Sequence, residues 1–105
     1  KKLFKIALIQ MKMQLEKVKN ISKAKEMIST AAENGADVIV LPEAFTCNYS
    51  RFPTEENAEP IDDYKTNEEA TAARMLSEAA KEHGKYIIGG SMPEKREDSK
   101  IYNTC

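Results

Sequence analysis

The residue in this chain best placed to do chemistry is Glu43. It follows Pro42 and the apolar run of residues 38–41, whose four consecutive branched side chains are typical of a strand buried on both faces. Pro42 ends the strand because it has no N–H to donate to a neighbour. A carboxylate at the edge of an apolar core loses solvation, which raises its pKa toward the range useful for a general base or acid. Open α/β folds build sites at strand ends, so Glu43 is a candidate general base; a solvated loop glutamate is the alternative.

The residues just after Glu43 have the mixed aromatic and polar character of a small-molecule pocket. Phe45 and Tyr49 are the candidate substrate-binding residues. The alternative is that Phe45 packs in the core and Tyr49 only fixes the loop. Cys47 lies four residues beyond Glu43, but a carboxylate is a weak base for a thiol unless burial raises its proton affinity. We therefore interpret Cys47 as an ordinary thiol and not as a nucleophile.

Three further features could carry chemistry, and each has a simpler structural interpretation. His83, the single histidine, precedes Gly84 at the expected end of a helix, where a basic side chain complements the helix dipole. The Gly-Gly-Ser sequence of residues 89–91 is not followed by the helix of a phosphate-binding loop, so close packing of a strand explains it better. Glu94 repeats the Pro-Glu pair, but it lies in a run of charges and is expected to be solvated.

The composition limits the classes of function open to the chain. Its 105 residues form at most one domain, and sixteen basic against seventeen acidic residues give a net charge of −1. This balance argues against a nucleic-acid or anionic membrane surface as the partner. We find no membrane-spanning run and no signal-peptide pattern. Cys47 and Cys105 are too few for a disulfide framework or a zinc site, so we expect reduced thiols, no metal and a cytoplasmic location.

The elements that position these residues alternate between strands and helices. Strands are expected over residues 5–10, 36–41 and 85–91, with a helix between each pair. Helices of that length allow right-handed crossovers between parallel strands, so the fold class is α/β with a β-α-β-α-β order. Residues 93–100 are charged and turn-like, and residues 101–105 begin a further strand.

Both expected helices have recognisable ends. The apolar stripe of the first helix consists of Val18, Ile21, Ala24, Ile28 and Ala31. Asn34-Gly35 is a typical helix end. The second helix is expected over residues 67–83, with Asn67 or Thr66 as its cap. The loop of residues 46–66 is long for such a connection, which is typical of functional or disordered segments.

Four segments of the chain form an ordered set: Lys5–Gln10, Gly35–Phe45, Ile88–Glu94 and Tyr102–Thr104. In order and spacing they resemble the nitrilase, or carbon–nitrogen hydrolase, superfamily. Within that superfamily the chain looks most like the omega-amidase branch, in which a Gly-Gly-Ser stretch precedes Tyr-Asn-Thr-Cys. The resemblance implies an α-β-β-α sandwich, with residues 1–105 as the N-terminal part of a single, incomplete hydrolase domain.

The resemblance also implies a reaction. Members hydrolyse small non-peptide amides through a Glu-Lys-Cys triad without metal or organic cofactor, and the omega-amidase branch acts on 2-oxoglutaramate and 2-oxosuccinamate. Glu43 matches the family's glutamate, which acts as the general base, and Phe45 and Tyr49 match loop positions near its pocket. The family's lysine and cysteine lie on later strands than these, so we expect the 105 residues alone to be inactive. A homodimer formed through the outer helices is a further implication.

Two other classes of function remain open from the sequence. A non-catalytic α/β binding or assembly module would also fit a chain in which only one triad residue is found. A Rossmann-like nucleotide binder fits less well, because the chain has no Gly-rich fingerprint between a strand and a helix.

Overall fold

The chain folds as a parallel three-stranded sheet with two helices, followed by a hairpin. The computed structural model describes residues 3–48, 50 and 56–105. The elements within these residues are β1 (Ile6–Leu8), α1 (Lys17–Glu33), β2 (Val38–Val40), α2 (Thr71–His83), β3 (Tyr86–Ile88), β4 (Met92–Lys95) and β5 (Ile101–Thr104). Strands β1, β2 and β3 are parallel with β2 in the centre, while β4 and β5 pair antiparallel. The predicted α/β order and parallel sheet are confirmed.

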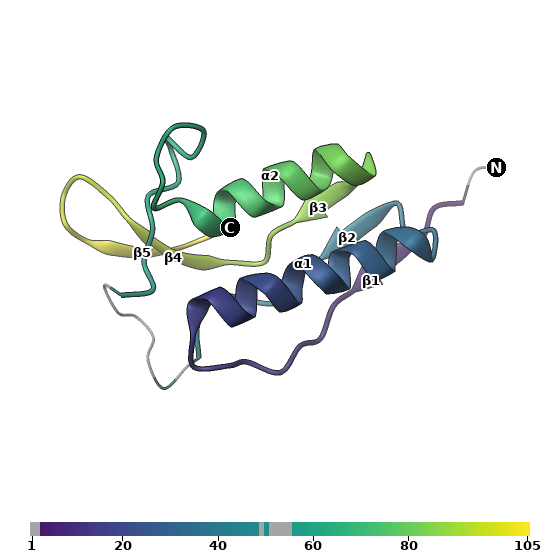
Figure 1. Cartoon of the computed structure of the whole chain (residues 1–105), viewed down its shortest axis with the longest axis horizontal. Coiled ribbons are helices and arrows are strands. Elements are labelled where there is room, and N and C mark those ends of the chain that lie inside the picture. Colours follow the sequence, from purple (N-terminus) through teal and green to yellow (C-terminus); the bar gives the residue numbers. More distant parts are fainter. Residues whose placement is uncertain (1–2, 49, 51–55) are drawn as a thin grey trace.

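The two helices cover one face of the sheet. They lie side by side across β1, β2 and β3 and pack against each other, while the hairpin extends beyond one end of the sheet (Figure 1). Because side chains alternate along a strand, only one set on each strand faces the helices. In the three paired strands that set includes Ala7, Ile39 and Ile87, which belong to or pack against the core.

The other face of the sheet is open and apolar. Ile6 and Leu8 of β1 are 51% and 76% exposed, and Tyr86 and Ile88 of β3 are 79% and 48% exposed. The expectation that the second strand is buried on both faces is therefore wrong for this chain, where Val38 and Val40 are only half-buried. The reason is that helices cover one side only, so the chain supplies one α layer and one β layer.

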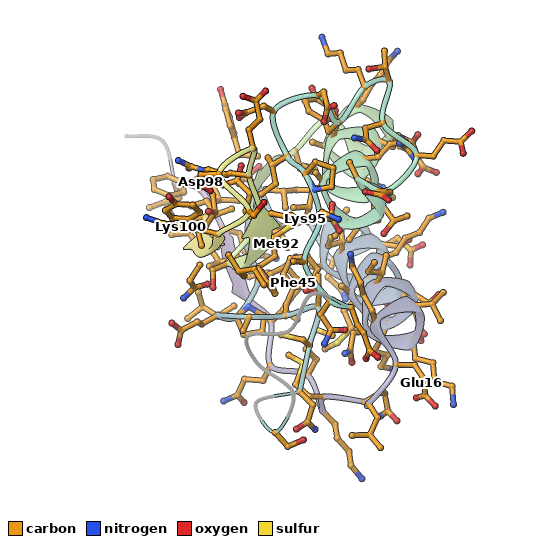
Figure 2. All side chains as sticks on the ribbon, turned by 90° about the vertical axis from the view of Figure 1, so that its left-hand side faces the viewer. Glu16, Phe45, Met92, Lys95, Asp98 and Lys100 are labelled. Atoms are coloured by element: carbon orange, nitrogen blue, oxygen red, sulfur yellow. The ribbon has the colours of Figure 1, made fainter. Side chains whose placement is uncertain are left out.

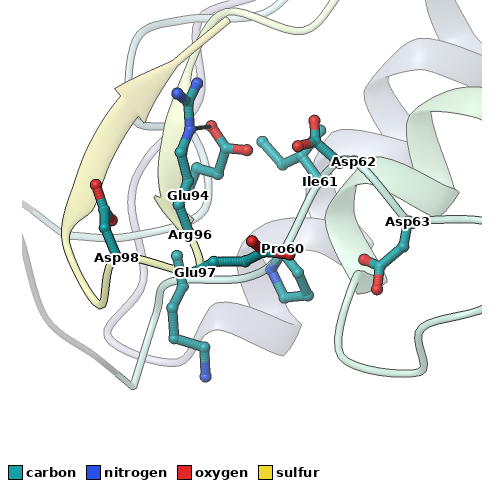
Figure 3. Close-up of a pocket in the computed structure, with 9 residues that line it drawn as sticks. Pro60, Ile61, Asp62, Asp63, Glu94, Arg96, Glu97 and Asp98 are labelled. Atoms are coloured by element: carbon teal, nitrogen blue, oxygen red, sulfur yellow. Dashed lines mark hydrogen bonds and ion pairs between the residues drawn. The ribbon is translucent and has the colours of Figure 1, made fainter.

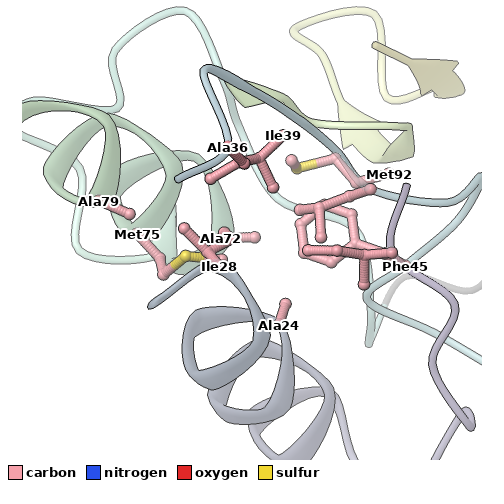
Figure 4. Packing of buried hydrophobic residues seen from close by; sticks show 11 residues of the cluster. Ala24, Ile28, Ala36, Ile39, Phe45, Ala72, Met75, Ala79 and Met92 are labelled. Carbon is pink, nitrogen blue, oxygen red and sulfur yellow. The ribbon is translucent and has the colours of Figure 1, made fainter. Parts of the chain in front are cut away.

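The core lies between the two helices and the sheet. Alanines at the helix contact let the backbones approach closely, and larger side chains fill the remaining space. The labelled side chains of Figure 4 are Ala24, Ile28, Ala36, Ile39, Phe45, Ala72, Met75, Ala79 and Met92. In a view from the hairpin end, Asp98 and Lys100 lie on one side, the helices on the other, and Phe45 and Met92 between them (Figure 2).

Two helix predictions need correction. Val18, assigned to the apolar stripe of α1, is 69% exposed, whereas Ala24 and Ile28 are fully buried as predicted. The polar residue Asn20 takes the inward position near the start of the helix. The second helix begins at Thr71 and not at residue 67, because its first backbone N–H groups are bound by a side chain from elsewhere in the sequence.

The charged segment before the last strand also differs from the prediction. Residues 92–95 form strand β4 instead of a turn, and only residues 96–100 connect it to β5. The expected strand near the end of the chain is confirmed as β5 (Ile101–Thr104). The prediction failed because Glu94 is a paired, buried residue of a hairpin, which a charge run does not reveal.

Candidate functional site

Glu43 lies at the carboxyl end of the central strand. Backbone hydrogen bonds continue just beyond β2, where the Leu41 N–H donates to the Ile88 carbonyl over 2.9 Å. Pro42 then leaves the sheet, and Glu43 stands in the turn that follows. This is the edge at which parallel sheets collect functional side chains.

The backbone around Glu43 is held by the segment after β3. Ala44 has a φ of 50°, in the left-handed region that costs a residue with a Cβ about 1–3 kcal/mol. Its N–H donates to Ser91 Oγ over 2.8 Å, and the Phe45 N–H donates to the Ser91 carbonyl over 3.1 Å. A Cβ on Gly90 would stand 2.1 Å from the Pro42 carbonyl oxygen. The Gly-Gly-Ser sequence is thus a close-packing feature, as predicted.

The carboxylate of Glu43 is exposed in this chain, which corrects the expectation that it is desolvated. It lies at the end of a sheet whose second face is open, so no apolar layer shields it. Glu43 Oε2 accepts a hydrogen bond from Asn103 Nδ2 on β5 over 3.2 Å. The side chain is therefore oriented by the protein, although it remains in contact with solvent.

The structure describes only one of the two predicted substrate-binding residues. Phe45 is fully buried in the core, which is the packing alternative stated above. Phe45 belongs to the turn that begins at Glu43, and its side chain packs into the core with no accessible surface. Tyr49 lies outside the described residues.

Cys47 is a buried thiol, and its surroundings suit the interpretation as an ordinary cysteine. Its side chain has no exposed surface, and burial raises the pKa of the thiol even though Lys17 and Thr46 act in the opposite direction. A thiol with a raised pKa is protonated at neutral pH and is a poor nucleophile. His83 lies in the last turn of α2 before Gly84, the position predicted for a structural histidine.

Asn20 is a buried polar residue whose function the sequence did not reveal. Its Oδ1 accepts from the Gln14 N–H over 2.7 Å, and its Nδ2 donates to the Gln14 and Thr46 carbonyls, each over 3.1 Å. It therefore joins the connection before α1 to the turn that carries Glu43. A single asparagine on a lysine-rich helix gave no signal for this role.

Glu59 is a second buried acid that sequence reasoning missed. It has no exposed surface, and its two carboxylate oxygens accept from the N–H groups of Ala72 and Ala73, each over 3.0 Å. Lys17 Nζ lies 2.7 Å from Oε1. Glu59 thus caps α2 and ties it to α1. Its negative charge at the helix N-terminus also complements the helix dipole.

Glu94 is buried and paired, so the expectation that it is solvated is wrong. It is 2% exposed, and its Oε1 accepts from Arg96 Nε over 3.0 Å and from Thr104 Oγ1 over 2.8 Å. The Arg96 contact is drawn in Figure 3, where Glu94 lines a hollow between the hairpin and residues 60–63. Its negative charge is paired with Arg96, and its hydrogen bond with Thr104 joins β4 to β5, so Glu94 stabilises the hairpin.

Some kinds of site have no counterpart in the described residues. Within them, no group of three or more His, Cys, Asp or Glu side chains is arranged to hold a metal ion. None of the helices that the structure describes is long and apolar enough to cross a membrane.

Comparison with known proteins assigns the family. Residues 5–105 match the carbon–nitrogen hydrolase family. The chain belongs to the carbon–nitrogen hydrolases. The crystal structure of Nit3 from Saccharomyces cerevisiae, a member of branch 10 of the nitrilase superfamily, superposes on 95% of this chain and 37% of its own, with a TM-score of 0.78 and 27% identity. The fold therefore matches part of a nitrilase-superfamily structure, whose architecture is an α-β-β-α sandwich.

Several relatives of this hydrolase chain are omega-amidases by name. Omega-amidase NIT2 of Danio rerio is 38% identical over 102 residues, which cover 97% of this chain and 34% of that protein. Nitrilase homolog 2 of Dictyostelium discoideum is 40% identical over 105 residues, covering 99% of this chain and 30% of that protein. The chain thus spans about one third of the length of these relatives.

Proposed function

We propose that the protein containing this hydrolase chain is an amidase of the omega-amidase type, with Glu43 as its general base. Residues 1–105 would form the N-terminal part of one hydrolase domain. The observation that carries the proposal is the placement of Glu43 directly after the central strand, on a backbone turn held by Ser91 and beside Asn103. The omega-amidase relatives support the same activity.

The proposed reaction uses Glu43 to move protons at each step. Glu43 takes the proton from a cysteine thiol, and the thiolate attacks the amide carbonyl carbon. A lysine stabilises the resulting oxyanion. The C–N bond then breaks as Glu43 returns the proton to the departing ammonia, which leaves a thioester. Glu43 next takes a proton from water, and the resulting hydroxide attacks the thioester carbonyl carbon. The C–S bond breaks to release a carboxylic acid, and Glu43 returns its proton to the thiolate to restore the thiol. The cysteine and lysine of this proposed triad would lie outside residues 1–105.

The proposed substrates are small 2-oxo acid amides, 2-oxoglutaramate or 2-oxosuccinamate. Phe45 and Tyr49 are proposed to shape the pocket, Phe45 through the packing of the turn. We further propose that the enzyme needs no metal or organic cofactor, works as a homodimer in the cytoplasm, and is inactive as residues 1–105 alone. The near-neutral charge of the chain supports a small-molecule partner in preference to nucleic acid.

The test is a Glu43→Gln variant of the full-length protein, assayed for ammonia release from 2-oxoglutaramate. Glutamine keeps the size of the side chain but removes its basicity, so kcat should fall at least about 1,000-fold, as for other members of a catalytic triad. Glu68→Gln, an exposed residue before α2, is the matched control and should retain full activity. Normal turnover by Glu43→Gln would remove Glu43 from the mechanism.

A further inference from the structure

Glu43 is contacted from two directions by the same part of the chain. Ser91 directly precedes β4, and Asn103 lies on β5 opposite Pro93 in the hairpin. Ser91 binds the backbone after Glu43, and Asn103 binds its carboxylate. The two contacts therefore come from one hairpin and not from independent loops.

The hairpin is itself held in place by the rest of the fold, so it can fix the position of Glu43. The Glu59 N–H donates to the Pro93 carbonyl over 3.1 Å, and the Lys95 N–H donates to the Glu59 carbonyl over 2.9 Å. Because the Glu59 side chain also caps α2, the hairpin is connected to the helical layer. Ser91, Met92 and Glu94 are all buried, so the near end of the hairpin belongs to the folded core.

The backbone contact does more than fill space. Ala44 adopts a left-handed φ of 50° that an alanine avoids on its own. The Ser91 hydroxyl, 2.8 Å from the Ala44 nitrogen, holds this conformation in a buried place where a lost acceptor would leave the N–H unpaired. Strain of this kind is characteristic of functional sites, and here it directs the side chain that precedes it in sequence.

We propose that the β4–β5 hairpin is the positioning element of Glu43. Ser91 sets the backbone turn and Asn103 orients the carboxylate by donating a hydrogen bond to Oε2. Both are positioning residues, because they act through Glu43. This inference rests on the proposed function, since it gives the two residues a role in the same reaction.

Variants of Asn103 test whether its hydrogen bond to Glu43, and not only the shape of its side chain, is needed. In the full-length protein, Asn103→Leu removes the Nδ2 donor. Asn103→Asp keeps the shape of the side chain but replaces the donating nitrogen by an oxygen that cannot donate to Glu43. Both should lower kcat about 10- to 100-fold with little change in KM, because misplacement of a catalytic group costs about that much. Full activity of Asn103→Asp would overturn the positioning role of Asn103, since the shape of the side chain would then suffice without a hydrogen-bond donor. Tyr102 lies beside Asn103 on β5 and donates a hydrogen bond to Asp98 in the hairpin turn; Tyr102→Phe, which loses this bond, is the control and should stay active.

The Ser91 arm asks whether the hydroxyl acts through Ala44. Ser91→Ala should lower kcat about 10-fold without a matching change in KM. Adding Ala44→Gly should restore part of the loss, because glycine adopts a positive φ without steric cost. A merely structural role for Ser91 predicts no recovery, and that result would overturn the proposal.

Glu43→Gln, assayed in parallel, distinguishes failure of the proposed function from failure of the positioning role. If Glu43→Gln is inactive while the Ser91 and Asn103 variants are normal, the proposed function stands and the positioning role fails. If Glu43→Gln is fully active, the proposed function itself fails. Melting temperatures of all variants should stay well above the assay temperature, so that losses of kcat report positioning and not unfolding.

Discussion

At the scale of single residues, the buried carboxylate of Glu59 takes the place of the Ser, Thr, Asp or Asn that caps most helices. Ala70 is the N-cap residue that directly precedes α2, and its side chain makes no capping hydrogen bond. Glu59 supplies both acceptors from a segment outside the helix, and its charge is balanced by Lys17. A capping search along the local sequence cannot find such a partner, which is why the helix was predicted to begin too early.

The Glu59–Lys17 pair should matter for stability. Glu59→Ala should lower the free energy of unfolding by about 3–5 kcal/mol, because it removes the cap and leaves Lys17 unpaired in a mostly buried position. A Lys17→Met, Glu59→Met double variant should lose less unfolding free energy than the sum of the losses of Lys17→Met and Glu59→Met measured singly. Chemical denaturation of the full-length protein measures both. Glu26→Ala is the control, since its pair with Lys23 is exposed and is worth about 0–1 kcal/mol.

At the scale of elements, the sequence was most informative where apolar spacing is regular. The strands around Ile39 and Ile87 and the inward positions of Ala24 and Ile28 on α1 follow from that spacing, and the structure confirms them. Strand β4 was missed because tertiary packing buries its charged residue Glu94, which pairs with Arg96, and a run of charges in the sequence does not reveal this burial. In the same way, Glu43 could be found from its place after Pro42, whereas Ser91 and Asn103 could not. Their contacts with residues 43 and 44 depend on the packing of separate elements.

Substitution of two glycines distinguishes the effect of a steric clash with the Glu43 turn from the effect of backbone strain alone. Gly84 and Gly90 have nearly the same φ, 63° and 60°, but a Cβ would meet nothing within 4 Å at Gly84 and the Pro42 carbonyl at 2.1 Å at Gly90. Gly84→Ala should cost about 1–2 kcal/mol of stability and leave kcat unchanged. Gly90→Ala should cost more and also reduce kcat, because the turn that carries Glu43 must move. Thermal denaturation and the ammonia assay together measure the difference; equal effects of both substitutions would contradict it.

At the scale of the whole molecule, the open face of the sheet connects the fold to the site. Ile6, Leu8, Tyr86 and Ile88 form an apolar surface on the side away from the helices, and Glu43 lies at one end of the same strands. In an α-β-β-α sandwich a second sheet covers such a face. The same layer would cover the strand ends and exclude water from around the carboxylate. If the full-length protein has such a layer, we expect it to bury both Glu43 and the apolar sheet face.

A pair of substitutions tests this relation between layer and site. In this chain Leu8 is 76% exposed on the open sheet face and Val18 is 69% exposed on α1. If a second sheet covers the strands in the full-length protein, Leu8→Glu buries a charge there and should cost at least about 2 kcal/mol of unfolding free energy. Val18→Glu, on the helical side, should cost less than about 0.5 kcal/mol, as for other surface substitutions. Equal stability of the two variants in urea denaturation would mean that the sheet face stays open, and Glu43 would then work in contact with bulk water.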